Sequence, residues 1–517
     1  MMKRYLMTLA AGLMLMPLAA QETYENAKLA ENDLNGTARY VGMGGAMEAL
    51  GADISTISSN PAGIGLFRKS QANLSFGVVS QQDGKSFGGG HKTNMSFDQV
   101  GFVWATRSGE NGFLNFAFNF HKSKNFDYIL SAADRLNNAS QNKLTYAKQK
   151  NGLLFPADQN GVPDFNKPYV ECNQLDDIYA RYINYDTRDN TWYYENANAY
   201  TMDRYHAGYI GEYDFNISGN INNRVYLGMT IGYHDVHYRH YGEYVESFAV
   251  NSPIMVQDDR KITGSGADLK AGVIFRPVEY SPFRIGLSVS TPTWFKLETY
   301  NYTTLSDDGG TSDPNHEGYE FKLYTPWKYG LSLGHTVGDY LALGASYEFT
   351  DYGSMDSRVI TGTHYDWWTD DYYDDTESDD VMNRHTAETL RGVNTLKLGA
   401  EYKPSPEIAV RLGYNYVSPM YEKDGFKDGS LSSEGSYYSS ATDFTNWDAT
   451  HRITCGLGFQ IEKVNLALAY QYSAQNGHFE PFMSYQDNQY ADDDNIADAV
   501  KVSKKRHQLL LTATYNF

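Results

Sequence analysis

Several short patterns in this 517-residue chain contain residue types that could do chemistry. Gly330-Leu331-Ser332-Leu333-Gly334 matches the Gly-x-Ser-x-Gly pattern of hydrolases, in which a strand-to-helix turn exposes the nucleophilic serine. Here the pattern falls within an alternating strand, so Ser332 is expected to face inward between two leucines, and no helix follows. We therefore expect no catalytic residue and no enzyme activity.

The histidines His234, His237 and His240 could suggest a metal site. On a strand that rises about 3.3 Å per residue, His234 and His240 lie roughly 20 Å apart on one face, and His237 points to the other. One ion cannot join them, and a solvated strand extension is the simpler interpretation. We expect no metal site here.

Two further patterns could bind a cofactor or a cation. Gly42-Met43-Gly44 begins like a dinucleotide-binding loop, but the third glycine position is Met47 and no βαβ unit surrounds it. The acidic runs 366–380 and 492–494 lack the spacing, central glycine and final glutamate of an EF-hand. Solvated loops explain them, calcium binding stays open, and no cofactor is expected.

Composition narrows the class of protein. Lysine and arginine number 43 against 63 acidic residues, a net charge of −20, which argues against nucleic acid as a partner because its phosphates require basic contacts. Mean hydropathy is −0.54, as in many soluble proteins. A transmembrane barrel has the same average, because only alternate strand residues touch lipid. The 46 Gly, 43 Tyr and 25 Phe fit such a barrel.

The N-terminus has the three parts of a secretory signal peptide. Lys3 and Arg4 precede an apolar stretch from Tyr5 to Leu18, and Ala19-Ala20 comes before polar residues. The apolar stretch is shorter than the roughly 20 residues of a spanning helix. We expect residues 1–20 to be a signal peptide and the mature protein to be exported.

Strict alternation of apolar and polar residues is clearest at the C-terminus. Between residues 508 and 517, Leu509, Leu511 and Tyr515 alternate with polar positions, as in a strand with one face in lipid. A Lys or Arg on the lipid face costs roughly 2–4 kcal/mol at the midplane, whereas a wet lumen tolerates it. The strand charges therefore face inward, among them Arg284, Lys397, Glu401 and Arg411.

The alternation predicts an all-β fold, a transmembrane antiparallel β-barrel of about 14 strands. Candidate strands cover residues 71–80, 96–107, 112–122, 207–219, 223–238, 262–277, 282–299, 318–335, 340–352, 388–403, 407–419, 447–462, 464–475 and 503–517. A soluble β-sandwich has similar strands. Alternating short and long connections favour a barrel instead, with short periplasmic turns and long extracellular loops.

The long extracellular loops are expected at residues 123–206, 353–387, 420–446 and 476–502. The first contains stretches that look helical, Tyr128 to Asn138 and Gln174 to Ile183. Because loops of this length are usually functional or disordered, we interpret it as a partly folded cap over the outer mouth.

A glycine-rich segment precedes the first strand. It runs from Asn35 to Ala46, and an Asp53-Ile54-Ser55 segment then leads to Asn60-Pro61-Ala62-Gly63. In order and spacing it resembles the N-terminal hatch of the outer membrane long-chain fatty acid transporter family of hydrophobic compound channels. The dipeptides Thr291-Pro292 and Thr325-Pro326 echo the family, and Phe517 is similar to the terminal aromatic of the outer-membrane assembly signal.

The resemblance implies a barrel over residues 70–517, plugged by a hatch (plug) domain over residues 21–69 inside the lumen. It implies loop capture of a hydrophobic ligand, hatch-gated passage and lateral exit through a kinked third strand. It also implies a place in the cell outer membrane, with outer-membrane lipid and the barrel-assembly machinery as partners. The third strand of this chain, Gly112 to His121, has no internal Gly or Pro to mark a kink.

Apolar hatch residues are the candidate ligand-binding residues. They could line the ligand path or merely pack the plug against the wall: Met43, Met47, Leu50, Ile54, Ile57, Ile64, Leu66 and Phe67. The hatch motif Asn60, Pro61, Ala62 and Gly63 is expected to form a structural turn, because Pro fixes φ and Asn favours turns.

Two functions are consistent with these sequence features. The first is passive outer-membrane transport of hydrophobic small molecules such as long-chain fatty acids. The alternative is a binding or scaffold barrel of the same fold that acts in protein secretion or surface attachment.

Overall fold

The computed structural model describes residues 22–109, 112–150, 179, 182–312, 314–368, 370–429, 431, 442–486 and 494–517. The predicted signal peptide, residues 1–20, lies outside the described residues, as does most of the helical stretch predicted over 174–183. None of the described helices is long and apolar enough to cross a membrane.

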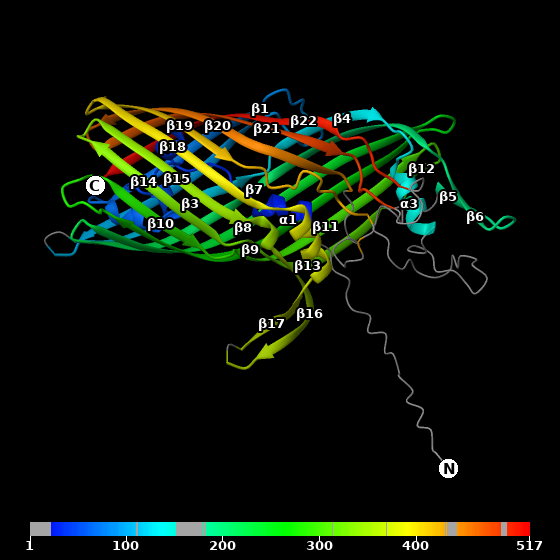
Figure 1. Ribbon diagram of the computed structural model, residues 1–517, viewed down its shortest axis with the longest axis horizontal. Coiled ribbons are helices and arrows are strands. Elements are labelled where there is room, and N and C mark those ends of the chain that lie inside the picture. Colours follow the sequence, from blue (N-terminus) through cyan, green and yellow to red (C-terminus); the bar gives the residue numbers. More distant parts are fainter. Residues whose placement is uncertain are drawn as a thin grey trace, which may run out of the picture.

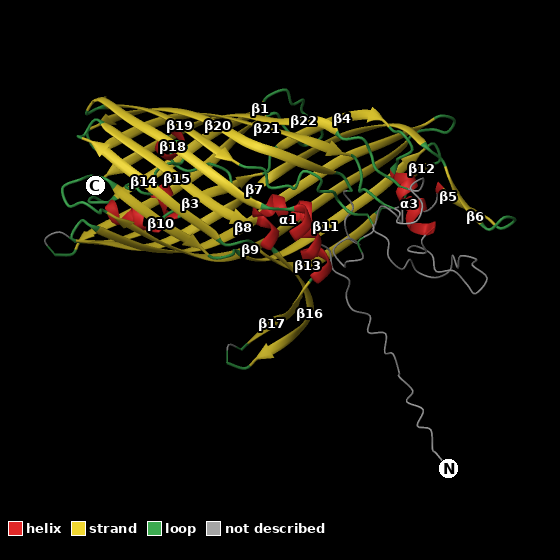
Figure 2. Ribbon diagram, in the orientation of Figure 1, coloured by secondary structure: helices red, strands yellow, loops and turns green. Residues whose placement is uncertain are grey.

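Fourteen antiparallel segments, which we call staves, form a closed transmembrane barrel (Figures 1 and 2). Each stave is made of one or two strands. Closure comes from the pairing of β1 with β22, in which Gln71 lies opposite Asn516. In order, the staves are β1 (Gln71–Gln81), β2 (Thr93–Arg107), β3 (Phe113–Asn125) with β4 (Tyr128–Arg135), β7 (Ala197–Ile221), β8 (Val225–Phe248), β9 (Ile254–Phe275), β10 (Arg284–Ser290) with β11 (Trp294–Asp307), β14 (Lys328–Val337) with β13 (Asn315–Tyr324), β15 (Leu341–Asp351) with β16 (Asp356–Asp366), β18 (Gly392–Ser405), β19 (Ile408–Val417), β20 (Phe444–Ile461), β21 (Val464–Glu480) and β22 (Val500–Asn516).

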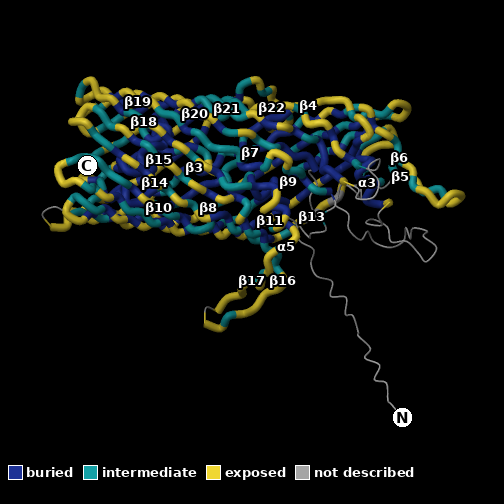
Figure 3. Tube along the Cα trace, in the orientation of Figure 1, coloured by how far each residue is buried: buried dark blue, intermediate teal, exposed yellow. Residues whose placement is uncertain are grey.

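The two faces of the wall differ as the alternation predicts. Along β22, Leu509 and Leu511 are exposed, whereas Leu510 and Thr512, which alternate with them, are buried. The predicted inward charges Lys397, Glu401 and Arg411 are also buried. Exposed and buried residues alternate along the strands of the wall (Figure 3). This arrangement keeps charge in the lumen and apolar surface toward lipid.

Both Thr-Pro dipeptides interrupt the wall. The seventh stave breaks at residues 291–293 and the eighth at residues 325–327. Proline has no N–H for the ladder, and threonine hydroxyls take over the neighbouring bonds. Thr291 Oγ1 accepts from Leu269 N at 3.0 Å, and Thr325 Oγ1 accepts from Thr293 N at 2.8 Å. The breaks are therefore satisfied irregularities.

The connections at one end are short, such as residues 222–224 between β7 and β8. At the other end they range from residues 249–253 between β8 and β9 to residues 136–196 between β4 and β7. The helix predicted over Tyr128–Asn138 is wrong, because residues 128–135 form β4, which pairs with β7 in register from Tyr128↔His206. Strand pairing overrides the local helical preference, and the helix follows as α3 (Gln141–Lys150).

Other long connections also contain regular structure. β16 continues past the wall into a hairpin with β17 (Asp371–Ser378), which projects from the side of the barrel (Figure 1). α5 (Asp380–Thr389) returns the chain to β18. The first long connection holds the small pair β5 (Ile183–Asp186) and β6 (Thr191–Tyr194), and β12 (Gly310–Thr311) folds back on β11.

Between residue 22 and β1, four short helices lie inside the barrel: α1 (Thr23–Ala30), α2 (Ala38–Gly42), η1 (Ile54–Ile57) and η2 (Pro61–Leu66) (Figure 1). Their backbone comes close to the wall at inward glycines. A Cβ at Gly344 would lie 1.9 Å from the Ala46 carbonyl oxygen. Eight successive staves each contribute an inward glycine that faces the hatch. Six meet its backbone, Gly228, Gly334, Gly344, Gly399, Gly413 and Gly456, and two meet its side chains, Gly272 and Gly286.

Candidate functional site

A cavity of about 200 Å³ lies inside the barrel beside the N-terminal part of the hatch. Residues 29–35, at the end of α1 and after it, form one side of the cavity. Inward residues of β3, β7, β9, β20 and β22 form much of the rest. The cavity is therefore bounded by a short stretch of hatch on one side and a fixed strand wall on the other.

One part of the cavity wall is apolar. It is formed by Tyr352, Val393, Met420 and Tyr421, which belong to one buried cluster with Tyr24 of α1. Rings of Tyr24 and Tyr421 stack with centroids 5.2 Å apart. This surface brings together α1, the end of β15 and the loop after β19, and it can contact a hydrocarbon chain.

A second part of the wall is basic. We call Lys124, Arg452, Lys504 and Arg506 the basic cluster; all four line the cavity. Lys124 Nζ lies 2.6 Å from Glu31 of the hatch. The Lys504 ammonium lies over the ring of Tyr128, 5.5 Å from its centroid.

The hatch carboxylate Asp33 faces the same cations. Its Oδ1 lies 3.7 Å from the Arg452 guanidinium and its Oδ2 lies 3.8 Å from that of Arg506. Burial alone would raise the pKa of Asp33, but Lys124 and Arg506 hold it well below the usual range. Four cations thus surround two hatch carboxylates, and the cluster keeps an excess of positive charge.

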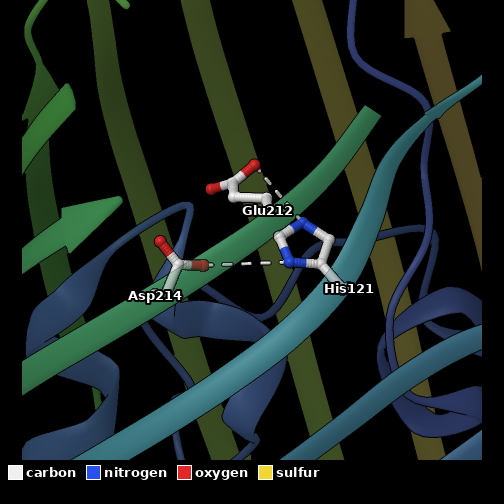
Figure 4. A group of neighbouring side chains, drawn as sticks. All are labelled: His121, Glu212 and Asp214. Atoms are coloured by element: carbon white, nitrogen blue, oxygen red, sulfur yellow. Dashed lines mark ion pairs between the residues drawn. The ribbon is translucent and has the colours of Figure 1, made fainter. Parts of the chain in front are cut away.

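A third part of the wall is acidic. We call His121, Glu212, Asp214, His234, Asp268 and Lys270 the acidic–histidine cluster. Figure 4 shows Glu212 and Asp214, from one strand, pointing toward His121 on the neighbouring strand. His121 Nδ1 also lies 3.3 Å from the Asn119 side-chain amide. All six residues of the cluster are buried on the inner face of β3, β7, β8 and β9.

The hatch backbone contacts the end of the third stave. The pairing of β3 with β7 shifts between Lys122 and Lys124, so Ser123 is outside the regular ladder. Asp33 N donates to Ser123 O at 2.7 Å, and Asn35 Nδ2 donates to Lys122 O at 3.1 Å. No kink was predicted within residues 112–121, and the irregularity follows just after them. Hatch residues 33–35 cover it from inside.

The eight apolar hatch residues predicted as ligand lining are packed in three clusters. Met43, Met47 and Leu50 pack with Leu34 and Tyr40. Four others, Ile54, Ile57, Ile64 and Phe67, pack against Val103 and Ala117 of the wall. Leu66 packs beside Ala62, Tyr226 and Ile274. None of the eight lines the cavity of about 200 Å³, so a ligand-lining role for them stays a prediction.

The hatch motif forms a turn against the wall. Asn60 caps η2, and its Oδ1 accepts from Ala62 N at 3.2 Å. Pro61 is the first residue of the helix, where its missing N–H costs nothing. Gly272 gives Asn60 room, because a Cβ there would lie 2.0 Å from Asn60 Oδ1. Gly63 likewise lies against Thr56.

Two buried ion-pair groups hold the middle of the hatch. Arg39 makes a bidentate contact with Glu401 at 2.9 and 3.0 Å, and Arg411 meets the same carboxylate at 2.6 Å. Lys397 Nζ lies 2.8 Å from Glu48, which also bonds Ser346. Charge-assisted bonds of this kind are short and directional, so this part of the hatch has a fixed position.

No protein-family model and no curated protein sequence matches the chain. Solved structures do. A FadL homologue of Pseudomonas aeruginosa is 13% identical with a TM-score of 0.48, over 94% of this chain and 100% of that one. The Ralstonia pickettii toluene transporter TbuX is 12% identical with a TM-score of 0.47, over 94% and 99%. The monoaromatic hydrocarbon channel CymD is 10% identical with a TM-score of 0.48, over 94% and 99%. At these identities the likeness concerns architecture.

The prediction for Ser332 is confirmed, whereas the prediction for the histidines of β8 is wrong at two positions. Ser332 is buried in the middle of β14 and faces inward as predicted. The solvated interpretation of the histidines is wrong for His234 and His240, which are buried and lie 3.0 and 3.2 Å from Asp268 and Asp258. Both histidines have the inward parity of β8, and the strand continues past its predicted end at residue 238, which places His240 inside the barrel as well.

The basic cluster and most of the acidic–histidine cluster were not among the predicted site residues. The signal that could have found them is parity: charged residues at inward positions of strands that pair in register. His121 lies opposite Glu212 in the β3–β7 register, and His234 lies opposite Glu212 in the β7–β8 register. The sequence does not supply that register, because it depends on turn and bulge positions.

Proposed function

We propose that this protein is an outer-membrane channel for the passive transport of hydrophobic small molecules with an anionic head group, long-chain fatty acids being the expected class. The observation that carries the proposal is the mixed lining of the cavity. Apolar residues such as Tyr352 and Val393 can contact a hydrocarbon chain, and Arg452 and Lys504 can bind a carboxylate. A purely apolar ligand that displaced Asp33 would leave Arg452 without a counter-charge, whereas a ligand carboxylate would replace it.

Hatch residues 31–35 are the proposed gate. Glu31 and Asp33 occupy the cations that a ligand carboxylate would need, so ligand binding and the hatch contacts compete. A ligand that displaces Asp33 would also loosen the contact with Ser123, which covers the irregular end of β3. Exit through the wall at that point is the route we propose, after capture by the long loops.

The test compares two ligands of equal chain length. Purified barrel is titrated with palmitate and with hexadecanol, which lacks the charge. We expect palmitate to bind at least about tenfold more tightly, a difference of about 1.4 kcal/mol. The double variant Arg452→Gln/Lys504→Gln should remove the difference, whereas Arg239→Gln, an exposed cation paired with Asp259, should keep it.

Uptake gives the second measurement. Cells that carry this barrel in place of their own fatty acid channel should take up labelled palmitate, and the double variant should do so more slowly. Unchanged uptake of every apolar solute tested, with and without the barrel, would overturn the proposal.

The β16–β17 hairpin supports the alternative function, a scaffold barrel in protein secretion or surface attachment. Its tip exposes Trp367 and Trp368, at 71% and 79%, and aromatic residues of this kind are enriched at protein interfaces. Affinity purification of the intact barrel tests the alternative. A stoichiometric protein partner that is lost on Trp367→Ala/Trp368→Ala, together with no palmitate binding, would favour it.

A further inference from the structure

The acidic–histidine cluster contains more carboxylates than its one lysine can neutralise. Lys270 Nζ lies 2.8 Å from Glu212 Oε1, 3.0 Å from Asp214 Oδ1 and 2.7 Å from Asp268 Oδ1. Each carboxylate therefore uses one oxygen on the same ammonium group. With neutral imidazoles, three negative charges meet one positive charge in a buried site. A buried charge without a partner is costly, so this arrangement favours uptake of a proton or of a cation.

The second carboxylate oxygens point to imidazole nitrogens at unusual distances. Glu212 Oε2 lies 3.6 Å from His121 Nε2, and Asp214 Oδ2 lies 3.8 Å from His121 Nδ1. Both distances exceed the roughly 3.2 Å upper range of an N–H···O bond. Two atoms that bind one ion at about 2.0–2.2 Å each are about 3–3.6 Å apart, so the pair that one ion would join is His121 Nε2 with Glu212 Oε2.

Asp214 supplies the second, independent observation. Its side chain is 0% exposed, and its Oδ2 accepts no hydrogen bond from the described residues. Buried carboxylate oxygens are nearly always hydrogen-bonded or bound to an ion. One ligand atom from each of His121, Glu212 and Asp214 can be chosen so that all lie within 4.8 Å of one another.

We propose that His121, Glu212 and Asp214 bind one divalent transition-metal ion in the lumen. One imidazole with two carboxylates suits zinc or manganese, whereas calcium and magnesium prefer oxygen ligands alone. Lys270 contacts the other oxygen of each carboxylate and so orients Glu212 and Asp214. His121 and Glu212 line the cavity, which gives an ion a route to the site. The ion balances the two excess negative charges and joins β3 to β7.

The probe is zinc alone. Barrel stripped with a chelator is titrated with Zn²⁺ by calorimetry, and bound metal is counted by elemental analysis after gel filtration. We expect one zinc per barrel and a higher unfolding temperature with zinc than without it. Asp214→Asn should weaken the Kd by at least about tenfold, as loss of a group that supports a metal does.

Two controls keep the test decisive. In Asp214→Asn one excess negative charge is gone, so the metal-free barrel should be at least as stable as the metal-free parent, which separates lost binding from misfolding. His237→Ala removes a histidine that pairs with Asp235 on the exposed face of β8 and should leave zinc binding unchanged. Less than one zinc per barrel, or equal zinc binding by Asp214→Asn and the parent protein, would overturn the proposal.

Discussion

Two segments of the hatch, residues 36–67 and residues 29–35, contact the barrel in different ways. Residues 36–67 press their backbone onto inward glycines and are held by buried ion pairs such as Arg39 with Glu401. Residues 29–35 instead line the cavity, and Asp33 reaches its cations at 3.7 and 3.8 Å. A segment held by short buried ion pairs and by close backbone contacts cannot move without disturbing the wall, whereas a segment whose charged contacts are long can. This difference supports the proposal that residues 36–67 are the plug and residues 31–35 the gate.

The largest expected effect comes from removing the charge of Glu401, which holds residues 36–67 of the hatch. Glu401→Gln removes the counter-charge of Arg39 and Arg411, and breaking a buried pair in this way costs about 3–5 kcal/mol. Urea unfolding followed by tryptophan fluorescence measures the loss. The control Glu422→Gln removes an exposed partner of Arg391 and should cost no more than about 1 kcal/mol. Equal losses of stability in the two variants would contradict a fixed position for residues 36–67.

A smaller loss should follow from filling one glycine contact. Gly344→Val places a side chain where a Cβ already lies 1.9 Å from Ala46 O, and overpacking of this kind costs about 1–3 kcal/mol. Gly318→Val is the matched control, because its nearest neighbour is the Tyr300 ring at 3.5 Å. The same unfolding assay compares them. If Gly344→Val is as stable as Gly318→Val, the hatch is not pressed against the wall.

A change in transport is expected at the gate. Asp33→Asn removes two long ion pairs but keeps an oxygen that can accept from Asn125 N, so it should cost less stability than Glu401→Gln, while palmitate uptake rises because the carboxylate no longer competes. The lowered pKa of Asp33 means that its contribution is present above the unfolded pKa of about 3.9 and is lost only as pH falls through the lower folded pKa. This contribution should therefore be constant between pH 5 and 8. Unchanged uptake by Asp33→Asn would exclude competition.

The sequence predicts the barrel well and the cavity poorly, for one physical reason. Alternation around residues such as Leu509 and Lys397 reports which face of a strand meets lipid, and each predicted strand corresponds to one stave. Cavity residues depend on which strands are neighbours and in what register. The role of Glu212 depends on its position opposite His121, and the role of the inward glycines depends on their contact with the hatch. These are long-range pairings that local patterns do not encode.

Cross-linking tests the central claim, that residues 31–35 move and residues 36–67 do not. In a background of Cys172→Ser and Cys455→Ser, D33C/S123C locks the gate, and A38C/T512C locks the plug. Each pair is joined by a hydrogen bond from a hatch N–H, at 2.7 Å in both cases, which brings the two residues into the range that a disulfide needs.

The measurement is palmitate uptake before and after reduction of each lock. Oxidised D33C/S123C should block uptake and regain it with reductant, whereas A38C/T512C should transport equally in both states. Full uptake through the locked gate, or a block by the locked plug that reductant relieves, would contradict the account.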